Sequence, residues 1–167
     1  MAKIMIILGS KSDLVTCDKA RMILQQFGMD YEIHIASAHR TPDFAVNLAK
    51  TAEEKGFCVI IAAAGLSAHL PGVLAAHTLL PVIGIPLNAG GMGGMESLLS
   101  ISQMPAGIPV ATMTVGEAGV LNAALFALAI ISLSDEGVKV KLTDYRSKLA
   151  SDVMEAESRL QKDLADG

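Results

Sequence analysis

The chain alternates between two patterns of hydrophobic positions. Short runs in which almost every residue is apolar are typical of strands covered on both faces, whereas apolar residues that recur every three or four positions are typical of helices. The short runs predict strands over residues 4–8, 31–36, 57–63, 81–85 and 109–112. The periodic segments predict helices from Ser10 to Gly28, over residues 42–55 and 68–78, around Ser97, and over residues 116–133 and 138–164.

This alternation of strands and helices predicts an α/β fold with a parallel sheet. The connections are short, so we expect them to be right-handed crossovers. The run over residues 57–63 is apolar throughout, which predicts a central strand covered on both faces. The length of 167 residues, without a linker, repeat or low-complexity segment, predicts a single domain over residues 1–167.

The last two predicted helices indicate assembly into an oligomer. The helix over residues 116–133 is apolar nearly all round, which is unusual for a helix on the outside of a monomer. The helix over residues 138–164 carries an apolar residue at every third or fourth position, and at 1.5 Å per residue it would be about 40 Å long. One small domain cannot cover that length, so we expect this helix to pack on a neighbouring subunit.

The composition narrows the classes of function. Hydrophobic residues make up 51% of the chain and the mean hydropathy is +0.47, which fits either a membrane protein or a subunit with buried helix faces. No uncharged apolar stretch reaches the roughly 18–20 residues of a spanning helix, and the N-terminus lacks the order of a signal peptide, so we expect no membrane association. A net charge of −4 without a Lys/Arg block disfavours nucleic acid. Two cysteines without metal or redox spacing suit a reducing, cytoplasmic compartment.

Ligands of an open parallel sheet bind beyond the carboxyl ends of the strands, so the loops that follow the strands are the places to search. The first loop places a glycine and then hydroxyls at a helix start, where free backbone N–H groups and the helix dipole favour an anion such as phosphate. The alternative is purely structural: Ser10 and Asp13 form a capping box and bind nothing.

The second loop carries His39 and Arg40 between a strand end and a helix that starts at Pro42. A guanidinium can form a forked contact with a phosphate or carboxylate, and an imidazole can exchange protons at neutral pH. The alternative is a surface histidine beside a surface arginine, and the spacing alone does not separate the two interpretations.

The third loop surrounds His69 with small residues, which would let a flat ring approach the backbone; tight packing of helix on sheet is the alternative. The glycine-rich fourth loop, residues 88–94, matches no dinucleotide motif and is expected to be flexible. His34 and His77 are expected to be structural.

No histidine pair at i, i+4 and no Cys/His cluster exists, so we expect no metal site. A serine hydrolase is disfavoured because the Gly-x-Ser-x-Gly elbow is missing.

Together these loops resemble the N5-carboxyaminoimidazole ribonucleotide mutase family over residues 4–151. The motifs that carry the resemblance, in the family's order, are Gly9-Ser10-Lys11-Ser12-Asp13, Ser37-Ala38-His39-Arg40-Thr41-Pro42, Ala68-His69-Leu70-Pro71-Gly72, Gln103-Met104-Pro105 with Gly107-Ile108-Pro109-Val110, and Asn122-Ala123-Ala124. The resemblance implies a flavodoxin-like three-layer α/β/α sandwich with a central parallel sheet and a long C-terminal helix. It also implies a homo-octamer.

The activity that the resemblance implies is an isomerisation in purine biosynthesis. N5-carboxyaminoimidazole ribonucleotide becomes 4-carboxy-5-aminoimidazole ribonucleotide, without metal or organic cofactor. His39 would be the catalytic acid–base residue. The residues that would bind this phosphoribosyl imidazole substrate are Ser10, Ser12, Asp13 and Arg40 around the ribose and phosphate, and Ser37, Ala38, Ala64, Gly65, His69, Leu70 and Pro71 around the ring and carboxylate.

Two other functions compete with the mutase. A second branch of the family carboxylates aminoimidazole ribonucleotide directly with CO2; it tends to carry lysine in place of Arg40 and lacks the run from His69 to Gly72, so this sequence follows the mutase branch. Leu66 and Ser67 stand where that branch often has glycine or alanine, which leaves the depth of the pocket open. A non-catalytic receiver-like module would need an acidic cluster after the first strand, where this chain has residues 9–12 instead.

Overall fold

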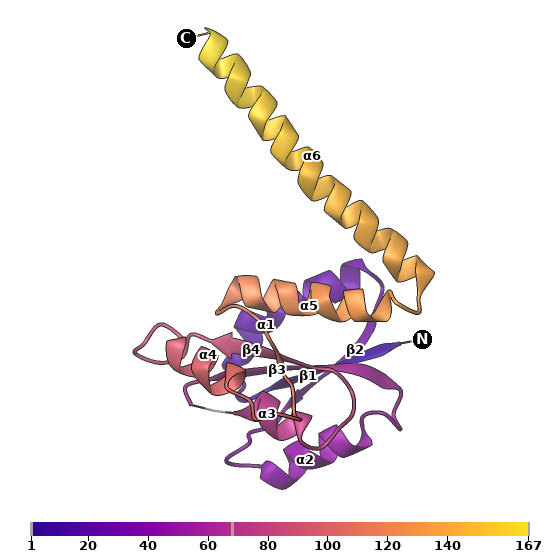
Figure 1. Ribbon diagram of the computed structural model, residues 1–167, viewed down its shortest axis with the longest axis vertical. Coiled ribbons are helices and arrows are strands. Elements are labelled where there is room, and N and C mark those ends of the chain that lie inside the picture. Colours follow the sequence, from indigo (N-terminus) through magenta and orange to yellow (C-terminus); the bar gives the residue numbers. More distant parts are fainter. Residues whose placement is uncertain (1, 68, 167) are drawn as a thin grey trace. The chain divides into compact units, whose positions relative to one another are not determined.

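A sheet of five parallel strands forms the centre of the computed structural model, which describes residues 2–67 and 69–166 (Figure 1). The order of the strands across the sheet is β2-β1-β3-β4-β5, and every pairing is parallel. This confirms the predicted α/β fold, and the order is that of flavodoxin-like proteins. The strands are β1 (Lys3–Leu8), β2 (Asp30–Ile35), β3 (Phe57–Gly65), β4 (Val82–Leu87) and β5 (Ala111–Thr112).

Strand β3 is central, as its apolar sequence predicts. Ile60 and Ile61 point to opposite faces of the sheet and both are fully buried. Strand β1 lies between β2 and β3, with Leu8 level with Ile35 on one side and with Ala63 on the other. The carboxyl ends of these three strands therefore meet at one edge, and the loops that follow them start side by side.

Helices cover both faces of the sheet. Helices α2, α3 and α4 form a contiguous layer on one face, and α1 and the start of α5 lie on the opposite face (Figure 1). This arrangement is the expected three-layer sandwich. The helices of the described chain are α1 (Asp13–Gln26), α2 (Pro42–Thr51), α3 (Leu70–Ala75), α4 (Met95–Ser102), α5 (Glu117–Ile131) and α6 (Glu136–Asp166).

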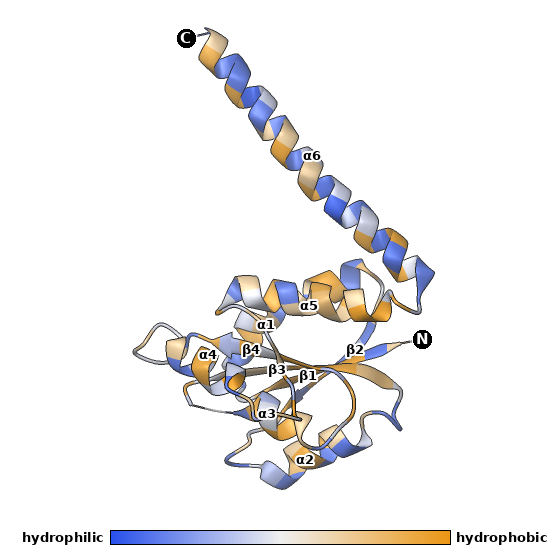
Figure 2. Cartoon of the chain, in the orientation of Figure 1, coloured by the Kyte–Doolittle hydropathy of each residue, from blue (hydrophilic) through white to orange (hydrophobic). Residues whose placement is uncertain are grey.

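The core follows from the alternation of side chains along the strands. Met5 and Ile7 of β1 belong to a buried cluster with Leu48 of α2 and Leu74 of α3. The alternate residues of β1, which point toward the other face, are also buried. Figure 2 shows the hydrophobic residues concentrated along the sheet, whereas hydrophilic and hydrophobic residues alternate along α6. Burial on both faces holds the strand ends, and hence the loops beyond them, in fixed positions.

Three of the predicted elements are clearly shorter in the structure. The strand expected over residues 109–112 is reduced to the two residues of β5, because this edge strand begins after Pro109, which has no N–H for a ladder. Helix α3 is shorter than the expected helix over residues 68–78, and Ala68 lies outside the described residues. Helix α2 ends at Thr51, and turns lead from it to Gly56.

The long C-terminal helix is present, as expected. The described chain divides into two compact units between Ala127 and Leu128, and α6 belongs to the second. Its 31 residues correspond to about 46 Å, and every residue from Arg146 to Asp166 is exposed. Among the helices that the structure describes, none is both long enough and apolar enough to cross a membrane.

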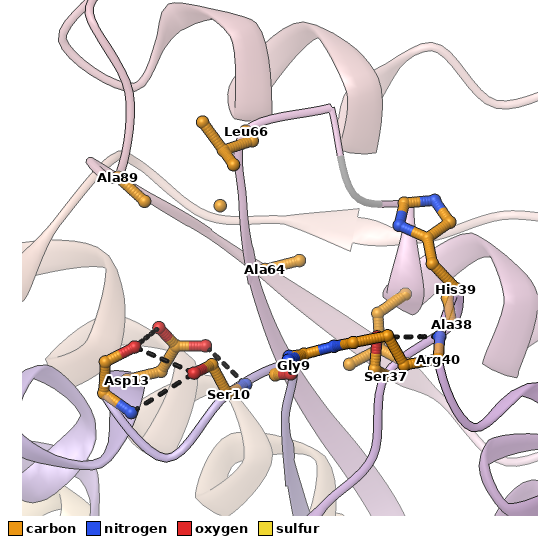
Figure 3. A pocket seen from close by; sticks show the side chains of 13 residues that line it. Gly9, Ser10, Asp13, Ser37, Ala38, His39, Arg40, Ala64, Leu66 and Ala89 are labelled. Carbon is orange, nitrogen blue, oxygen red and sulfur yellow. Dashed lines mark hydrogen bonds between the residues drawn. The ribbon is translucent and has the colours of Figure 1, made fainter.

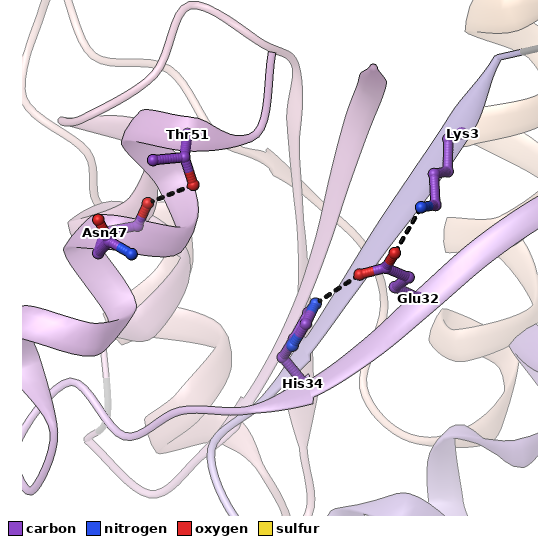
Figure 4. A network of polar contacts seen from close by, with 5 residues as sticks. All are labelled: Lys3, Glu32, His34, Asn47 and Thr51. Atoms are coloured by element: carbon purple, nitrogen blue, oxygen red, sulfur yellow. Dashed lines mark hydrogen bonds and ion pairs between the residues drawn. The ribbon is translucent and has the colours of Figure 1, made fainter. Parts of the chain in front are cut away.

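The polar residues of β1 and β2 form a separate network (Figure 4). Glu32 forms ion pairs with Lys3 and, at 3.2 Å, with the imidazole Nε2 of His34. The hydrogen bond from Lys3 is the main cause that lowers the pKa of Glu32. His77 contacts the carbonyl oxygen of Val73 through Nδ1 at 2.8 Å. Neither histidine lines the cavity described below.

Candidate functional site

A cavity of about 390 Å³ lies at the carboxyl edge of the sheet (Figure 3). The loops after β1, β2 and β3 form most of its wall, and one residue after β4 completes it. This is the place that the topology predicts for a ligand. The residues that line the cavity are Gly9, Ser10, Ser12, Asp13, Ser37, Ala38, His39, Arg40, Ala64, Gly65, Leu66, Leu70 and Ala89.

The first loop is held by Asp13, the first residue of α1. Its Oδ2 accepts a hydrogen bond from the backbone N–H of Ser10 at 2.9 Å, and the hydroxyl of Ser12 donates to the hydroxyl oxygen of Ser10 at 2.9 Å. The capping box was expected with Ser10 as N-cap, but the N-cap is Ser12 and its side chain makes no capping bond. The carboxylate half of the box forms, and the hydroxyl oxygen of Ser10 accepts the N–H of Ser12 at 3.4 Å.

Asp13 brings a negative charge to this side of the cavity. Burial raises the pKa of Asp13, and the hydrogen bonds from Ser10 and Ser12 and the charge of Arg40 oppose that rise. One carboxylate oxygen is fixed by the loop, and Oδ1 lies 3.4 Å from the Ser12 hydroxyl. A carboxylate has about four acceptor positions, so Asp13 can also accept hydrogen bonds from hydroxyl groups of a ligand.

The second loop forms a closed turn between β2 and α2. The N–H of Ser37 donates to Thr41 Oγ1 at 2.9 Å, and the N–H of Thr41 donates to the carbonyl oxygen of Ser37 at 2.9 Å. The hydroxyl of Ser37 also accepts the N–H of Arg40 at 3.2 Å. Pro42 then opens α2 with a φ suited to the first helical turn. This turn places His39 and Arg40 at the cavity wall.

The third loop supplies the apolar part of the wall. Gly65 ends β3, and a Cβ there would lie 2.5 Å from the Cβ of Ala89, so only glycine fits. Leu66 follows with a φ of +56°. In Figure 3, Leu66 and Ala89 lie above Ala64, with His39 to one side and Asp13 to the other.

His69 and Pro71, both expected in the site, do not line this cavity, whereas Leu70 does. The imidazole of His69 lies against Gly72, where a Cβ would be 1.8 Å from Nε2. Its Nδ1 is buried and has no hydrogen-bond partner within the described part of the chain. The ring is therefore packed against Gly72 at the start of α3.

Sequence reasoning missed three lining residues: Gly9, Leu66 and Ala89. Gly9 and Leu66 stand in loops that were singled out, but neither carries a polar side chain that would mark it as a ligand contact. Ala89 belongs to the fourth loop, which was expected only to be flexible. The usable signal for all three was topological, because each follows the carboxyl end of a strand.

The arrangement defines what the cavity can do. Arg40 and the hydroxyls of Ser10 and Ser12 can hold an anion, and His39 can exchange a proton with a ligand beside it. The opposite part of the wall is apolar and suits a flat ring or a small non-polar molecule. Within residues 2–67 and 69–166, no group of three or more His, Cys, Asp or Glu side chains is placed to hold a metal ion.

Comparison with known proteins adds to this geometry. Residues 3–152 match the family model described as AIR carboxylase. The N5-carboxyaminoimidazole ribonucleotide mutase of Bacillus subtilis is 50% identical over 155 residues, which cover 93% of this chain and 96% of the relative. The mutase of Escherichia coli is 45% identical over 154 residues, with 92% and 91% covered. The crystal structure of Treponema denticola PurE superimposes with a TM-score of 0.83 at 29% identity and covers 96% of this chain and 99% of that one.

Proposed function

Since the chain belongs to the AIR carboxylase family, we propose that it is an isomerase that converts N5-carboxyaminoimidazole ribonucleotide to 4-carboxy-5-aminoimidazole ribonucleotide in purine biosynthesis. One observation carries this proposal for the chain itself. His39, Arg40 and the serines of the first loop, which are far apart in the sequence, line a single cavity with an apolar wall. A phosphorylated ribose attached to a flat ring needs this combination of an anion site, a proton carrier and an apolar surface.

The substrate is proposed to lie with its phosphate at Arg40, Ser10 and Ser12. A guanidinium and hydroxyl groups match phosphate oxygens in charge and in hydrogen-bond direction. Asp13 accepts hydrogen bonds from the ribose hydroxyls. The imidazole ring and its carboxylate lie against the other proposed residues that line the cavity, which are Ser37, Ala38, Ala64, Gly65 and Leu70. His69 and Pro71, which flank Leu70 in the chain, are outside this lining.

The proposed reaction has two steps with His39 in both. First the bond between the 5-amino nitrogen and the carboxylate carbon breaks; its electron pair stays on nitrogen, which takes a proton from protonated His39, and CO2 is released. Ring carbon C4 then attacks the CO2 carbon, and neutral His39 removes the proton from C4, which restores the aromatic ring. The same group is acid and then base, which is efficient when its pKa lies near the working pH. Retention of CO2 makes its recapture effectively unimolecular.

The test of the activity uses purified protein, the synthetic carbamate substrate and buffer without bicarbonate. We expect product absorbance to appear under these conditions, because the carboxylate that is transferred comes from the substrate. A direct carboxylase would instead act on aminoimidazole ribonucleotide and require added bicarbonate. If the carbamate gives no product but aminoimidazole ribonucleotide with bicarbonate does, the protein is a direct carboxylase and not a mutase.

The role of His39 is tested by His39→Asn. Asparagine cannot carry a proton between nitrogen and carbon, so we expect turnover to be lost while substrate binding, measured by calorimetry, is largely kept. His34→Gln is the matched control, because His34 lies in the network with Lys3 and Glu32 outside the cavity. The control should turn over like the unchanged protein. Retained turnover in His39→Asn would assign the proton transfers to another group.

The proposal extends to assembly and location. We propose a homo-octamer in the cytoplasm, in which α6 packs on neighbouring copies of the same chain. The apolar residues of α6 support this assembly because they recur at helical spacing and are each at least half exposed: Leu149, Val153, Leu160 and Leu164. A second copy is the natural occupant, since an enzyme that binds one small substrate has no need of a different protein partner along this helix.

A further inference from the structure

The hydroxyl of Thr41 is not used where a threonine at a helix start normally uses it. Thr41 is the N-cap residue of α2, and the hydroxyl oxygen of such a threonine usually accepts an N–H of the first helical turn. Here the side chain makes no capping bond. Oγ1 instead accepts the N–H of Ser37 at 2.9 Å, and the hydroxyl donates to the carbonyl oxygen of Ser37 at 3.2 Å. The hydroxyl therefore holds the loop that precedes the helix.

Two side chains of the proposed reaction lie inside the turn that this hydroxyl closes. His39 and Arg40 stand between Ser37 and Thr41 in the chain, and both line the cavity. In Figure 3 the side chain of Arg40 extends toward Gly9, whereas the imidazole of His39 points in another direction. The directions of two adjacent side chains depend on the backbone that carries them. The contacts that fix this turn thus also fix the position of His39 relative to Arg40.

Thr41 can act on a ligand only through its neighbours, because it does not itself line the cavity. The residue is exposed, and water can replace a hydrogen bond that is lost there, so we expect its hydroxyl to add little to the free energy of unfolding. Catalysis is more sensitive to position, since a misplacement of about 1 Å can slow a reaction on the order of a hundredfold. Loss of the hydroxyl should therefore affect the reaction more than the stability.

We propose that Thr41 is a positioning residue, whose hydroxyl fixes the turn so that His39 reaches the reacting nitrogen and carbon while Arg40 holds the phosphate. This inference rests on the proposed mutase activity and adds to it a residue outside the cavity. The phosphate has several proposed contacts, at Arg40, Ser10 and Ser12, so binding tolerates a small shift of the turn. Proton transfer depends on the single imidazole of His39 and does not tolerate that shift.

The experiment compares variants with and without the hydroxyl by steady-state kinetics on the carbamate substrate. Thr41→Val keeps the branched shape and removes the hydroxyl. We expect kcat to fall about tenfold or more while KM changes by less than about threefold, because the loss affects proton transfer more than binding. Thr41→Ser keeps a hydroxyl at the same place, and its kcat should stay within about threefold of that of the unchanged protein.

Thr51→Val is the matched control on the same helix. Oγ1 of Thr51 donates to the carbonyl oxygen of Asn47 at 2.9 Å, and neither residue lines the cavity (Figure 4). This variant also loses a hydroxyl hydrogen bond of α2, but far from the turn, so its kcat and KM should equal those of the unchanged protein. Thermal unfolding of both valine variants shows whether they are folded under the assay conditions.

Thr41→Ala removes the same hydroxyl in a smaller residue and should show the same fall in kcat. If neither the valine nor the alanine variant folds, the hydroxyl has a structural role and the proposal is wrong. It is also wrong if folded Thr41→Val keeps its kcat, if only KM rises, or if Thr41→Ser loses as much turnover as Thr41→Val. Absence of turnover in the unchanged protein instead overturns the proposed function, on which the role of Thr41 depends.

Discussion

Nη2 of Arg40 donates a hydrogen bond to the carbonyl oxygen of Gly9 at 3.3 Å. The contact joins the loop after β2 to the loop after β1, across 31 positions of the sequence. The side chain proposed to bind the phosphate therefore also sets the distance between the two loops that surround it. The binding group and the shape of its site are coupled through one guanidinium.

Arg40→Lys should weaken substrate binding more than chemistry. Lysine keeps the positive charge but cannot make the forked contact or reach Gly9 at the same time. Loss of one charge-assisted hydrogen bond, worth about 1.5–3 kcal/mol, predicts a rise in KM of roughly tenfold or more, with a smaller change in kcat. Steady-state kinetics measure both constants. Arg21→Lys, at an arginine paired with Asp18, is the control, and an unchanged KM in Arg40→Lys would remove Arg40 from the phosphate site.

Asp13→Asn should change how stability depends on pH. Burial raises the pKa of Asp13 above 3.8, so the folded chain holds this proton at pH values where the unfolded chain has released it. The contribution of Asp13 to the free energy of unfolding is therefore most favourable below pH 3.8 and falls as pH rises through the raised pKa. Asparagine does not titrate and keeps an acceptor for the N–H of Ser10.

We thus expect the free energy of unfolding of Asp13→Asn to lose less between pH 3.8 and neutrality than that of the unchanged protein. Urea unfolding at a series of pH values measures this difference. The same variant should bind substrate more weakly, since a neutral amide is a poorer acceptor for ribose hydroxyls. If the free energy of unfolding depends on pH in the same way in the two proteins, the raised pKa of Asp13 is not the cause of the dependence.

Gly72→Ala should force the ring of His69 to move. A Cβ at this position would lie within 2.4 Å of Nε2, Cε1 and Cδ2 of the imidazole, and such overpacking typically costs about 1–3 kcal/mol. We expect a lower thermal unfolding midpoint, recovered when His69→Ala is added. Gly91→Ala is the control, because no atom lies within 4 Å of a Cβ there. Equal midpoints for the two alanine variants would mean that the ring has room to turn away.

The two cysteines should differ in reactivity. Burial is the main cause that raises the pKa of the Cys17 thiol to about 12, and the charge of Asp13 adds to it. Since only the thiolate reacts, the raised pKa keeps Cys17 unreactive near neutral pH. Iodoacetamide should modify Cys58, which is only partly buried, before Cys17. Mass spectrometry of the native and the urea-denatured protein checks this, and comparable native rates at both cysteines would contradict it.

The strands and the place of the site were predictable because they depend on the same physics. A central parallel strand is apolar on both faces, so the apolar run over residues 57–63 was enough to predict one. The ligand site was then expected at the edge of the sheet beyond the carboxyl end of that strand. The edge strand β5 was predicted too long because it pairs with β4 alone. Its apolar sequence therefore does not show where that pairing begins. The start of α1 was misplaced because both Ser10 and Ser12 are good N-cap residues, and spacing does not choose between them.

Individual site residues were less predictable than the site. Leu66 and Ala89 have no polar atoms in their side chains, so nothing in their chemistry marks them, although the fold places them at the cavity. The position of His69 was not predictable either. Its neighbours in the sequence suggested a ring-binding loop, but the imidazole lies where any residue larger than glycine at position 72 would place its Cβ, and the sequence does not show this contact.

Substitutions on α6 test the proposed assembly. Leu149 and Val153 lie four residues apart, hence on one side of the helix, and are 50% and 68% exposed. Burial of each against another copy would contribute about 1.5–3 kcal/mol, and a lysine in their place would have to be desolvated. The double variant Leu149→Lys, Val153→Lys should therefore dissociate to smaller species, as measured by size-exclusion chromatography with light scattering. Ser151→Lys adds a charge on the opposite side of the helix and should leave the mass unchanged. If the double variant keeps its helical content and its mass is unchanged, Leu149 and Val153 do not hold the subunits together.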